Sequence, residues 1–267
     1  MEKYKYQGME FDEGQMEEIK LGIEDELDSR LIELYANPKF DRRQMKEIYY
    51  GIKEGLSIKR LKVYANPEFN STQMSVMRNA LKCKMPIENV QLMANPKYSV
   101  QQMDEIYLGF RNGLTTEQVK VYTNPKFNPK EMNEIRIGYA LDLSKEEIEL
   151  YAKPIYNAMQ MRCIRKLTEY GYQKEEFGFL LKNVYDEMQA EEILWAIKRN
   201  NLSLEQIQYY ADPEFSSLEM RHIYCDLEAG LTEEQIDSYV YGSTTVEEMY
   251  QKRKALIKNL SNKERDR

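Results

Sequence analysis

The chain has 267 residues, and its 38 Lys and Arg against 45 Asp and Glu give a formal net charge of −7 at neutral pH. A mean hydropathy of −0.72, without an apolar run long enough to cross a bilayer, excludes a membrane-spanning chain. Three cysteines and one histidine, His222, are too few for a disulfide framework or a Cys/His zinc site. We therefore expect a soluble cytoplasmic protein that holds no metal, binds no other cofactor and does not act at a membrane.

A repeat of 29 residues organises the chain from its first residues onward. The motif Tyr-Ala-Asn-Pro-x-Phe begins, with some variation, at Tyr35, Tyr64, Met93, Tyr122, Tyr151 and Tyr210. Extending this period in both directions, with one repeat of 30 residues, predicts nine repeats that start near residues 6, 35, 64, 93, 122, 151, 180, 210 and 239. The repeats leave no linker, so we expect a single α-helical repeat domain over residues 1–267.

Each repeat, numbered from position 1 at the start of the motif, carries the signals of a helix start. Position 7 is an N-cap residue type and position 10 is Gln or Glu, which resembles a capping box. These pairs run from Asp12 with Gln15 to Thr245 with Glu248. Apolar residues at positions 11, 14 and 18 have helical spacing and form one buried stripe. The predicted helix ends fall near Gly55, Gly113, Gly171 and Gly230.

A shorter second helix is predicted next in each repeat, with further capping boxes at Ser144, Ser203 and Thr232. This helix ends before the Asn-Pro step, because the residue before a proline is disfavoured in the α region. Each repeat is then a helical hairpin that is marginal alone and stable when stacked on its neighbours. The predicted fold is all-α, an α-solenoid of about nine helical hairpins. Position 17 is small in seven repeats, which predicts a close approach of a neighbouring helix there.

The consensus Y-A-N-P-x-F-x-x-x-Q-M-x-E-I resembles tandem repeats of proteins encoded by Gram-positive gut bacteria and by their phages and mobile elements. The clearest copies are residues 35–63 and 93–121. The resemblance covers nearly the whole chain. It implies an α-helical repeat protein connected with mobile-element biology, and it supplies no catalytic residues.

Two repeat positions predict lines of side chains along the array. Methionine occupies position 11 in eight repeats, on the apolar stripe, so we expect it in the core. Position 15 is rich in tyrosine and arginine, which are enriched in binding hot spots and stack on nucleic-acid bases. The candidate partner-binding residues, the position-15 ladder, are Tyr49, Arg78, Tyr107, Arg136, Arg165 and Tyr224. The alternative is that these long side chains cover the edge of the core.

Charge and regularity both vary along the chain. Residues 1–34 hold four Lys and Arg against eleven Asp and Glu, and residues 251–267 hold seven against two. We interpret these ends as a polar cap and a frayed basic tail; docking of a charged partner is the alternative. Residues 151–209 depart most from the repeat, as a local bend or a site, and we expect Trp195 in the core.

Enzyme signatures are absent from the sequence: it has no phosphate-binding glycine loop, HExxH, GxSxG or CxxC motif. We expect no enzyme and no catalytic role for His222. The leading hypothesis is a monomeric, non-enzymatic protein-binding scaffold. Its sharper form is a phage or mobile-element inhibitor that binds a basic bacterial defence nuclease. The alternative is a single-stranded nucleic-acid-binding protein that uses the position-15 ladder, although the acidic charge balance disfavours it.

Overall fold

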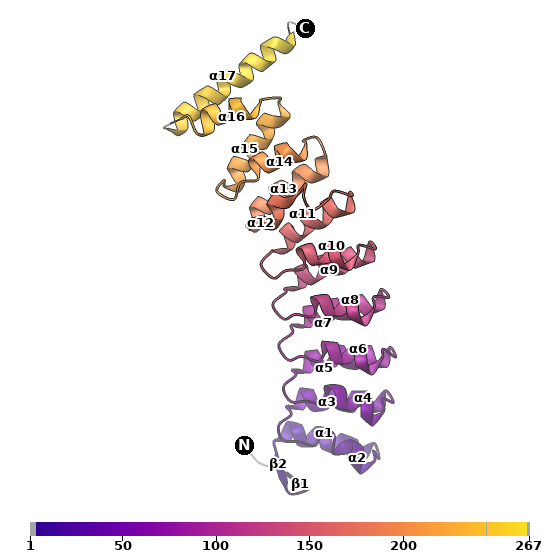
Figure 1. Ribbon diagram of the computed structural model, residues 1–267. Coiled ribbons are helices and arrows are strands. Elements are labelled where there is room, and N and C mark those ends of the chain that lie inside the picture. Colours follow the sequence, from indigo (N-terminus) through magenta and orange to yellow (C-terminus); the bar gives the residue numbers. More distant parts are fainter. Residues whose placement is uncertain (1–3, 244, 266–267) are drawn as a thin grey trace. The chain divides into compact units, whose positions relative to one another are not determined.

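The structure, a computed structural model, describes residues 4–243 and 245–265 (Figure 1). Within these two ranges it contains seventeen helices and one two-stranded sheet. The predicted all-α class, a solenoid of helical hairpins, is confirmed, whereas the count of nine repeats stays a prediction. No helix in the same two ranges combines the length and apolar composition that crossing a bilayer requires.

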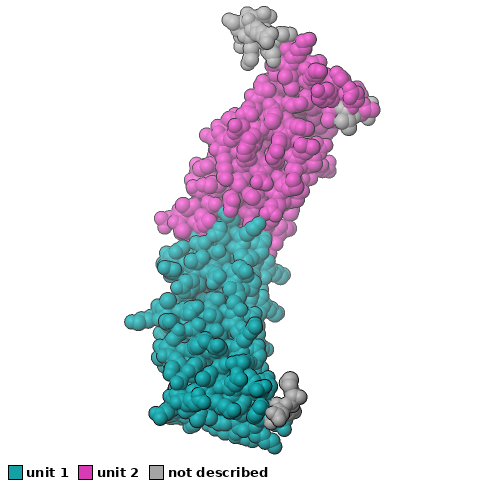
Figure 2. All heavy atoms as spheres, turned by 180° about the vertical axis from the view of Figure 1, so that it is seen from behind, with its two compact units in different colours: residues 1–136 teal, residues 137–267 magenta. Residues whose placement is uncertain are grey.

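The chain divides into two compact bodies, which we call the N-terminal body (residues 1–136) and the C-terminal body (residues 137–267) (Figure 2). The division falls inside α9 (Pro129–Ala140). Each body has helical hairpins of its own. The assignment of residues 1–267 to a single domain stays a prediction.

The N-terminal body alternates long helices of 12 residues with short ones. Its elements before α9 are β1 (Tyr4–Tyr6), β2 (Met9–Phe11), α1 (Glu13–Glu24), α2 (Ser29–Ile32), α3 (Arg42–Lys53), α4 (Ile58–Tyr64), α5 (Ser71–Lys82), α6 (Ile87–Met93), α7 (Val100–Arg111) and α8 (Thr116–Tyr122). The long helices α1, α3, α5 and α7 pack side by side in this order. Equivalent positions of neighbouring repeats therefore lie next to each other.

A β-hairpin precedes α1 and includes the positions that hold the Asn-Pro motif in later repeats. β1 and β2 pair antiparallel, with Tyr6 opposite Met9. The two residues between them, Gln7 and Gly8, have φ of 47° and 79°. Positive φ at both central residues is what a two-residue type I′ turn requires, and it is incompatible with a helix. The repeat pattern did not predict these strands, whereas the two helices predicted for the repeat that starts at residue 6 are both present, as α1 and α2.

The C-terminal body continues the alternation with less regular helices. After α9 its elements are α10 (Lys145–Tyr151), α11 (Ala158–Glu169), α12 (Gly178–Lys182), α13 (Glu187–Arg199), α14 (Leu204–Tyr210), α15 (Ser217–Glu228), α16 (Glu233–Val240) and α17 (Val246–Arg265). α11 packs on α13, α13 packs on α15, and α16 packs on α17. In repeat 7 the long helix α13 has 13 residues and is followed by Asn200 in the left-handed conformation, with φ of 51°.

The basic segment 251–267 is helical over most of its length. α17 starts with Glu247 and Glu248 in its first turn and runs without a break to Arg265. Acidic residues in a first turn stabilise a helix start through the macrodipole. The expectation of a frayed tail is thus wrong for residues 251–265, and residues 266–267 lie outside the described part of the chain.

The predicted helix signals hold. Each predicted N-cap accepts a hydrogen bond from the backbone N–H of position 10, as the Asp41 carboxylate does from Gln44 at 2.8 Å. The N-caps are Asp12, Asp41, Asn70, Ser99, Asn128, Asn157, Asp186, Ser216 and Thr245. The four predicted terminal glycines have φ between 78° and 89°, which is the left-handed conformation of a helix C-terminus.

The position-10 glutamine also fastens one repeat to the next. Gln44 accepts from the backbone N–H of Asp41 through Oε1, and its Nε2 donates to the carbonyls of Pro67 at 3.0 Å and Phe69 at 2.5 Å. We call this arrangement the glutamine staple. It recurs at Gln15, Gln73, Gln102 and Gln189. Gln160 also donates to two carbonyls of the following repeat, but its Oε1 accepts from the backbone N–H of Tyr185. Its amide uses both ends, which a glutamate cannot do.

The small residue at position 17 leaves room for a tyrosine of the next repeat. A Cβ added to Gly51 would overlap the hydroxyl of Tyr64, which donates to the carbonyl of Glu47 at 3.2 Å. We call this pairing the glycine–tyrosine lock. The same overlap defines the pairs Gly22 with Tyr35, Gly109 with Tyr122 and Gly138 with Tyr151. The predicted close approach is thus made by a buried tyrosine side chain.

The methionines of position 11 form the core, as predicted, in seven of the eight repeats that have them. The buried members are Met16, Met45, Met74, Met103, Met132, Met161 and Met220. Met249 in α17 is half-buried. This burial explains the methionine line without a binding role.

Candidate protein-binding surface

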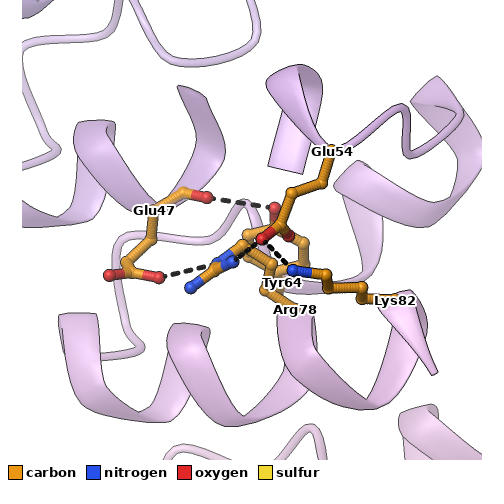
Figure 3. A network of polar contacts seen from close by, with 5 residues as sticks. All are labelled: Glu47, Glu54, Tyr64, Arg78 and Lys82. Carbon is orange, nitrogen blue, oxygen red and sulfur yellow. Dashed lines mark hydrogen bonds and ion pairs between the residues drawn. The ribbon is translucent and has the colours of Figure 1, made fainter. Parts of the chain in front are cut away.

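The position-15 ladder lies in the seams between successive repeats. Arg78, on α5, forms ion pairs with Glu47 at 3.0 Å and Glu54 at 2.6 Å, both in the preceding repeat (Figure 3). Lys82 approaches the same Glu54 oxygen at 2.8 Å, so one carboxylate joins two cations of the next helix. Only 12% of the Arg78 side chain is exposed. This arginine therefore couples repeats to each other.

The carboxylate at position 20 is the acceptor in this seam. Burial opposes the ionisation of Glu54, but hydrogen bonds from Lys82 and Arg78 outweigh it and lower the pKa of Glu54. One repeat earlier, Asp25 accepts from the Tyr49 hydroxyl and from Lys53. These hydrogen bonds lower the pKa of Asp25 and raise that of Tyr49 to about 12. Position 15 thus binds position 20 of the preceding repeat at both junctions.

The other ladder residues are held in similar ways. Arg136 pairs with Glu105 at 2.8 Å and is 13% exposed. Arg165 is buried and pairs with Glu169. Tyr224 is buried and donates to Asn201 at 2.9 Å. Because Arg165 and Tyr224 are buried, a partner does not reach their side chains. The prediction that these two residues bind a partner is therefore wrong. Tyr107 differs from them because it lines an open cavity.

Trp195 lies on the solvent side of α13, so the expectation of core packing is wrong. It is 39% exposed. Its ring lies 4.5 Å from the Tyr224 ring, and the Arg199 guanidinium lies 4.5 Å above the indole. Position 16 falls next to the buried stripe rather than on it, which explains the half-covered ring.

A line of exposed apolar side chains marks one edge of the C-terminal body. Position 5 lies in the loop before each long helix, and position 9 lies in the first turn of that helix. In repeats 6–8 position 5 of repeat 8 is Glu214, and the other five residues are apolar. We call these five the apolar edge: Ile155, Met159, Val184, Met188 and Leu218. Ile155, Met188 and Leu218 are more than 60% exposed, and Val184 is 50% exposed. Met159 is half-buried.

The same two positions are polar in repeats 2–5. We call their residues the polar edge, which comprises Lys39, Arg43, Glu68, Thr72, Lys97, Gln101, Lys126 and Lys130. All of these side chains are exposed. The fold therefore tolerates polar residues at both positions, and packing within the array does not require apolar ones in repeats 6–8.

The apolar residues at position 9 lie on successive helices that pack on each other. α11 packs on α13 and α13 packs on α15, and packed helices lie about 8–10 Å apart. Equal positions on successive long helices are separated by that distance, which methionine and leucine side chains largely span. Contiguous exposed apolar patches are uncommon on monomers and mark interaction surfaces. A charged rim surrounds this one, with Lys153, Glu187, Glu191 and Glu214 exposed.

The sequence interpretation missed this edge, although its signal was present. Each residue taken alone is an ordinary surface methionine, valine or leucine. The signal appears only when positions 5 and 9 are read down the repeats, because the residue type then changes from polar to apolar at Ile155. At position 15, which was chosen for its residue types, the ladder residues other than Tyr107 make contacts within the fold.

Comparisons with protein-family models, with curated proteins and with solved structures give no match. The resemblance to repeats of Gram-positive bacteria and their mobile elements therefore stays a prediction.

Proposed function

We propose that this protein is a non-enzymatic scaffold that binds another protein through its apolar edge. The observation that carries the proposal is the change from polar to apolar residues at five of the six sites that positions 5 and 9 provide in repeats 6–8. Protein interfaces have an apolar centre and a polar rim, and the edge with its charged surroundings fits that arrangement. A stack of repeats presents such an edge without distorting the core, since each repeat contacts only its neighbours.

A differential capture experiment tests the proposal. Immobilised full-length protein is exposed to lysate of its native host, beside a variant with Met188→Lys and Leu218→Lys. The matched control carries Thr72→Lys and Gln101→Lys, which place the same charges at position 9 of repeats 3 and 4. We expect the wild type and the control to retain the same protein and the first variant to lose it. Equal capture by all three would sink the proposal.

All four substitutions are at exposed positions, so the free energy of unfolding of either variant should change by no more than about 0.5 kcal/mol. Circular dichroism and urea unfolding of each variant check this. The other possible occupant of the edge is a second copy of this chain. We expect a monomer in sedimentation equilibrium; a dimer that dissociates in the Met188→Lys, Leu218→Lys variant would assign the edge to self-association.

The narrower hypothesis, an inhibitor that binds a basic bacterial defence nuclease, remains a proposal. The net charge of −7 supports it, because opposite charge accelerates association. For a captured basic nuclease, the association rate is expected to fall steeply as salt rises from about 0.05 to 0.5 M, where charges are screened. A rate that is indifferent to salt would remove charge mimicry.

Single-stranded nucleic-acid binding remains the alternative proposal from sequence. It requires guanidinium groups that are free to meet phosphates, whereas Arg78 and Arg136 are ion-paired and Arg165 is buried. A gel shift at low salt that disappears when these arginines are changed to glutamate would favour it over the scaffold.

A further inference from the structure

The junctions between repeats in the N-terminal body follow a template in which position 20 supplies a carboxylate. At the first junction Asp25 accepts from the residues at positions 15 and 19 of the next repeat, Tyr49 and Lys53. At the second junction Glu54 accepts from the same two positions, held by Arg78 and Lys82, at 2.6 Å and 2.8 Å (Figure 3). Each carboxylate therefore gathers two donors from the following long helix.

The third junction keeps the donors and lacks the carboxylate. Positions 15 and 19 of repeat 4 are Tyr107 and Arg111, the same kinds of donor as at the first junction, but position 20 of repeat 3 is Cys83. A thiol is a weak acceptor and carries no charge when protonated. Within the described part of the chain, neither the Tyr107 hydroxyl nor the Arg111 guanidinium has a hydrogen-bond or ion-pair partner, although both lie at the template positions.

A cavity of about 430 Å³ opens at this junction. Its lining includes Cys83, Lys84, Met85, Tyr107, Phe110 and Arg111. Two lining residues are cations and none is a carboxylate. Lys84 has φ of 63° and occupies the left-handed position that glycine holds in other repeats, so its charge is placed at the turn beside Cys83. Met85 and Phe110 add apolar wall.

We propose that this cavity binds the carboxylate of an aspartate or glutamate side chain from a partner protein. The bound carboxylate takes the place that Asp25 occupies at the first junction. It accepts from the Tyr107 hydroxyl and from the Arg111 guanidinium, and charge-assisted hydrogen bonds of this kind are the stronger ones. Lys84 adds a second positive charge, and Met85 and Phe110 contact the methylene groups of the ligand. The site goes beyond the proposed function, because it lies in the N-terminal body and takes an acidic ligand.

Cys83 allows the site to be probed without a known partner. Cys83 and Cys225 are exposed, whereas Cys163 is buried. Three symmetric disulfides are equilibrated with the full chain, each with an excess of its own thiol: those of 3-mercaptopropionate, 2-mercaptoethanol and cysteamine. The Cys83 thiolate attacks one probe sulfur, a mixed disulfide forms as the probe S–S bond breaks, and one thiol leaves. The probes place a carboxylate, a hydroxyl or an ammonium group next to Tyr107 and Arg111.

Peptide mass spectrometry gives the fraction of each mixed disulfide at both exposed cysteines. At Cys83 we expect the carboxylate probe to exceed the hydroxyl probe by at least fivefold, and the ammonium probe to be the least retained. Ratios between probes at one cysteine cancel the reactivity of that thiol itself. Cys225 is the internal control, where the carboxylate preference is expected to be absent. Equal preferences at Cys83 and Cys225 overturn the proposal.

Variants separate the cavity from the general charge of the surface. Arg111→Gln and Tyr107→Phe should each reduce the carboxylate preference at Cys83 by at least threefold. Lys97→Gln removes one positive charge from the polar edge and should leave the preference unchanged. A preference that survives both cavity variants, or that falls equally with Lys97→Gln, also overturns the proposal. None of these outcomes bears on the apolar edge, so this inference and the proposed function fail separately.

Discussion

Repeats 2–5 and repeats 6–8 are built from the same kind of helical hairpin, but their residues at the solvent-facing edge differ. All eight residues at positions 5 and 9 are polar from Lys39 to Lys130, whereas from Ile155 to Leu218 five of the six are apolar and Glu214 is the exception. The glutamine staple is present in both groups, with Gln44 and Gln189 as examples. Positions whose partner lies in the neighbouring repeat are held by packing, whereas solvent-facing positions are free to differ. A consistent change at the solvent edge therefore points to a function outside the fold.

The glycine–tyrosine lock also differs between these two groups: most of repeats 2–5 have it and none of repeats 6–8 does. Repeats 1, 2, 4 and 5 have it. Repeat 3 has Ala80 with Met93, repeat 6 has Leu167 with Leu180, repeat 7 has Ala196 with Tyr210, and repeat 8 has Asp226 with Tyr239. In repeat 8 the tyrosine hydroxyl donates to the Asp226 carboxylate. Alanine and tyrosine occur together only in repeat 7, where the segment from Ala196 to Tyr210 is one residue longer than the segment from Gly51 to Tyr64.

The largest expected effect comes from breaking the lock. Gly51→Ala should destabilise the protein by about 3 kcal/mol, because the added methyl overlaps the Tyr64 hydroxyl in a closely packed seam. Without this contact, alanine in a helix interior is better than glycine by about 1 kcal/mol. Urea unfolding measures the change.

Adding Tyr64→Met to Gly51→Ala reproduces the pair that repeat 3 has in Ala80 and Met93. This double variant should recover most of the lost stability. A single variant within 0.5 kcal/mol of the wild type, or a double variant no better than the single one, contradicts the lock.

The staple gives the next largest effect. Gln44→Glu keeps the acceptor for the Asp41 N–H but removes both donors to Pro67 and Phe69. We expect a loss of about 2 kcal/mol in the free energy of unfolding, the cost of leaving buried carbonyls unsatisfied. Gln101→Glu, at an exposed position 9, is the control and should change stability little.

Glu131 offers the reverse test, since it holds position 10 in repeat 5. Burial raises the pKa of Glu131, so the folded chain holds this proton more tightly than the unfolded chain does. Stability from this group therefore increases as pH falls through the raised pKa. Glu131→Gln should remove that increase and stabilise the protein at neutral pH; an unchanged pH profile of unfolding would argue against a buried, charged Glu131.

The carboxylate template predicts a smaller, pH-dependent effect. Glu54→Gln should cost about 1–2 kcal/mol at pH 7, because Arg78 and Lys82 lose a charged acceptor. The pKa of Glu54 is lowered in the folded state. Its contribution is therefore present above the unfolded pKa and lost as pH falls through the lowered value. Urea unfolding at pH 7 and pH 3 should show the difference shrinking, and a constant difference would contradict the template.

The smallest expected effect is a gain. Cys83→Asp supplies the third junction with the carboxylate that the first two have, next to Tyr107 and Arg111. We expect a stabilisation of about 0.5 kcal/mol at pH 7, in the range of partly exposed ion pairs. Cys83→Ser, which adds no charge, is the control. A loss of stability specific to the aspartate variant would show that the donors do not converge.

Local signals were enough to predict the fold. N-caps such as Asp41 and terminal glycines such as Gly55 act within a few residues of their position, so the sequence shows them directly. The ladder was harder, because Arg78 finds its partners at Glu47 and Glu54, 31 and 24 residues away, and their pairing depends on how repeats stack. Residue type at position 15 alone did not distinguish a binding surface from a seam.

The apolar edge and the third junction needed the stacked repeats as well. The sequence places Met188 in a helix but does not show that 66% of this residue is exposed. In the sequence Cys83 is an isolated thiol. The structure shows that the equivalent residues Asp25 and Glu54 accept hydrogen bonds from the next repeat. In both cases the informative comparison is between equivalent positions of different repeats, and only the structure says which of them face solvent.

The most direct test of the account is the affinity of the captured partner for three forms of the protein. Isothermal titration calorimetry should give an unchanged Kd for the Thr72→Lys, Gln101→Lys variant. It should give a Kd at least tenfold higher for the Met188→Lys, Leu218→Lys variant. An equal Kd for all three forms, or weaker binding only when the polar edge is changed, would contradict the assignment of the binding surface to repeats 6–8.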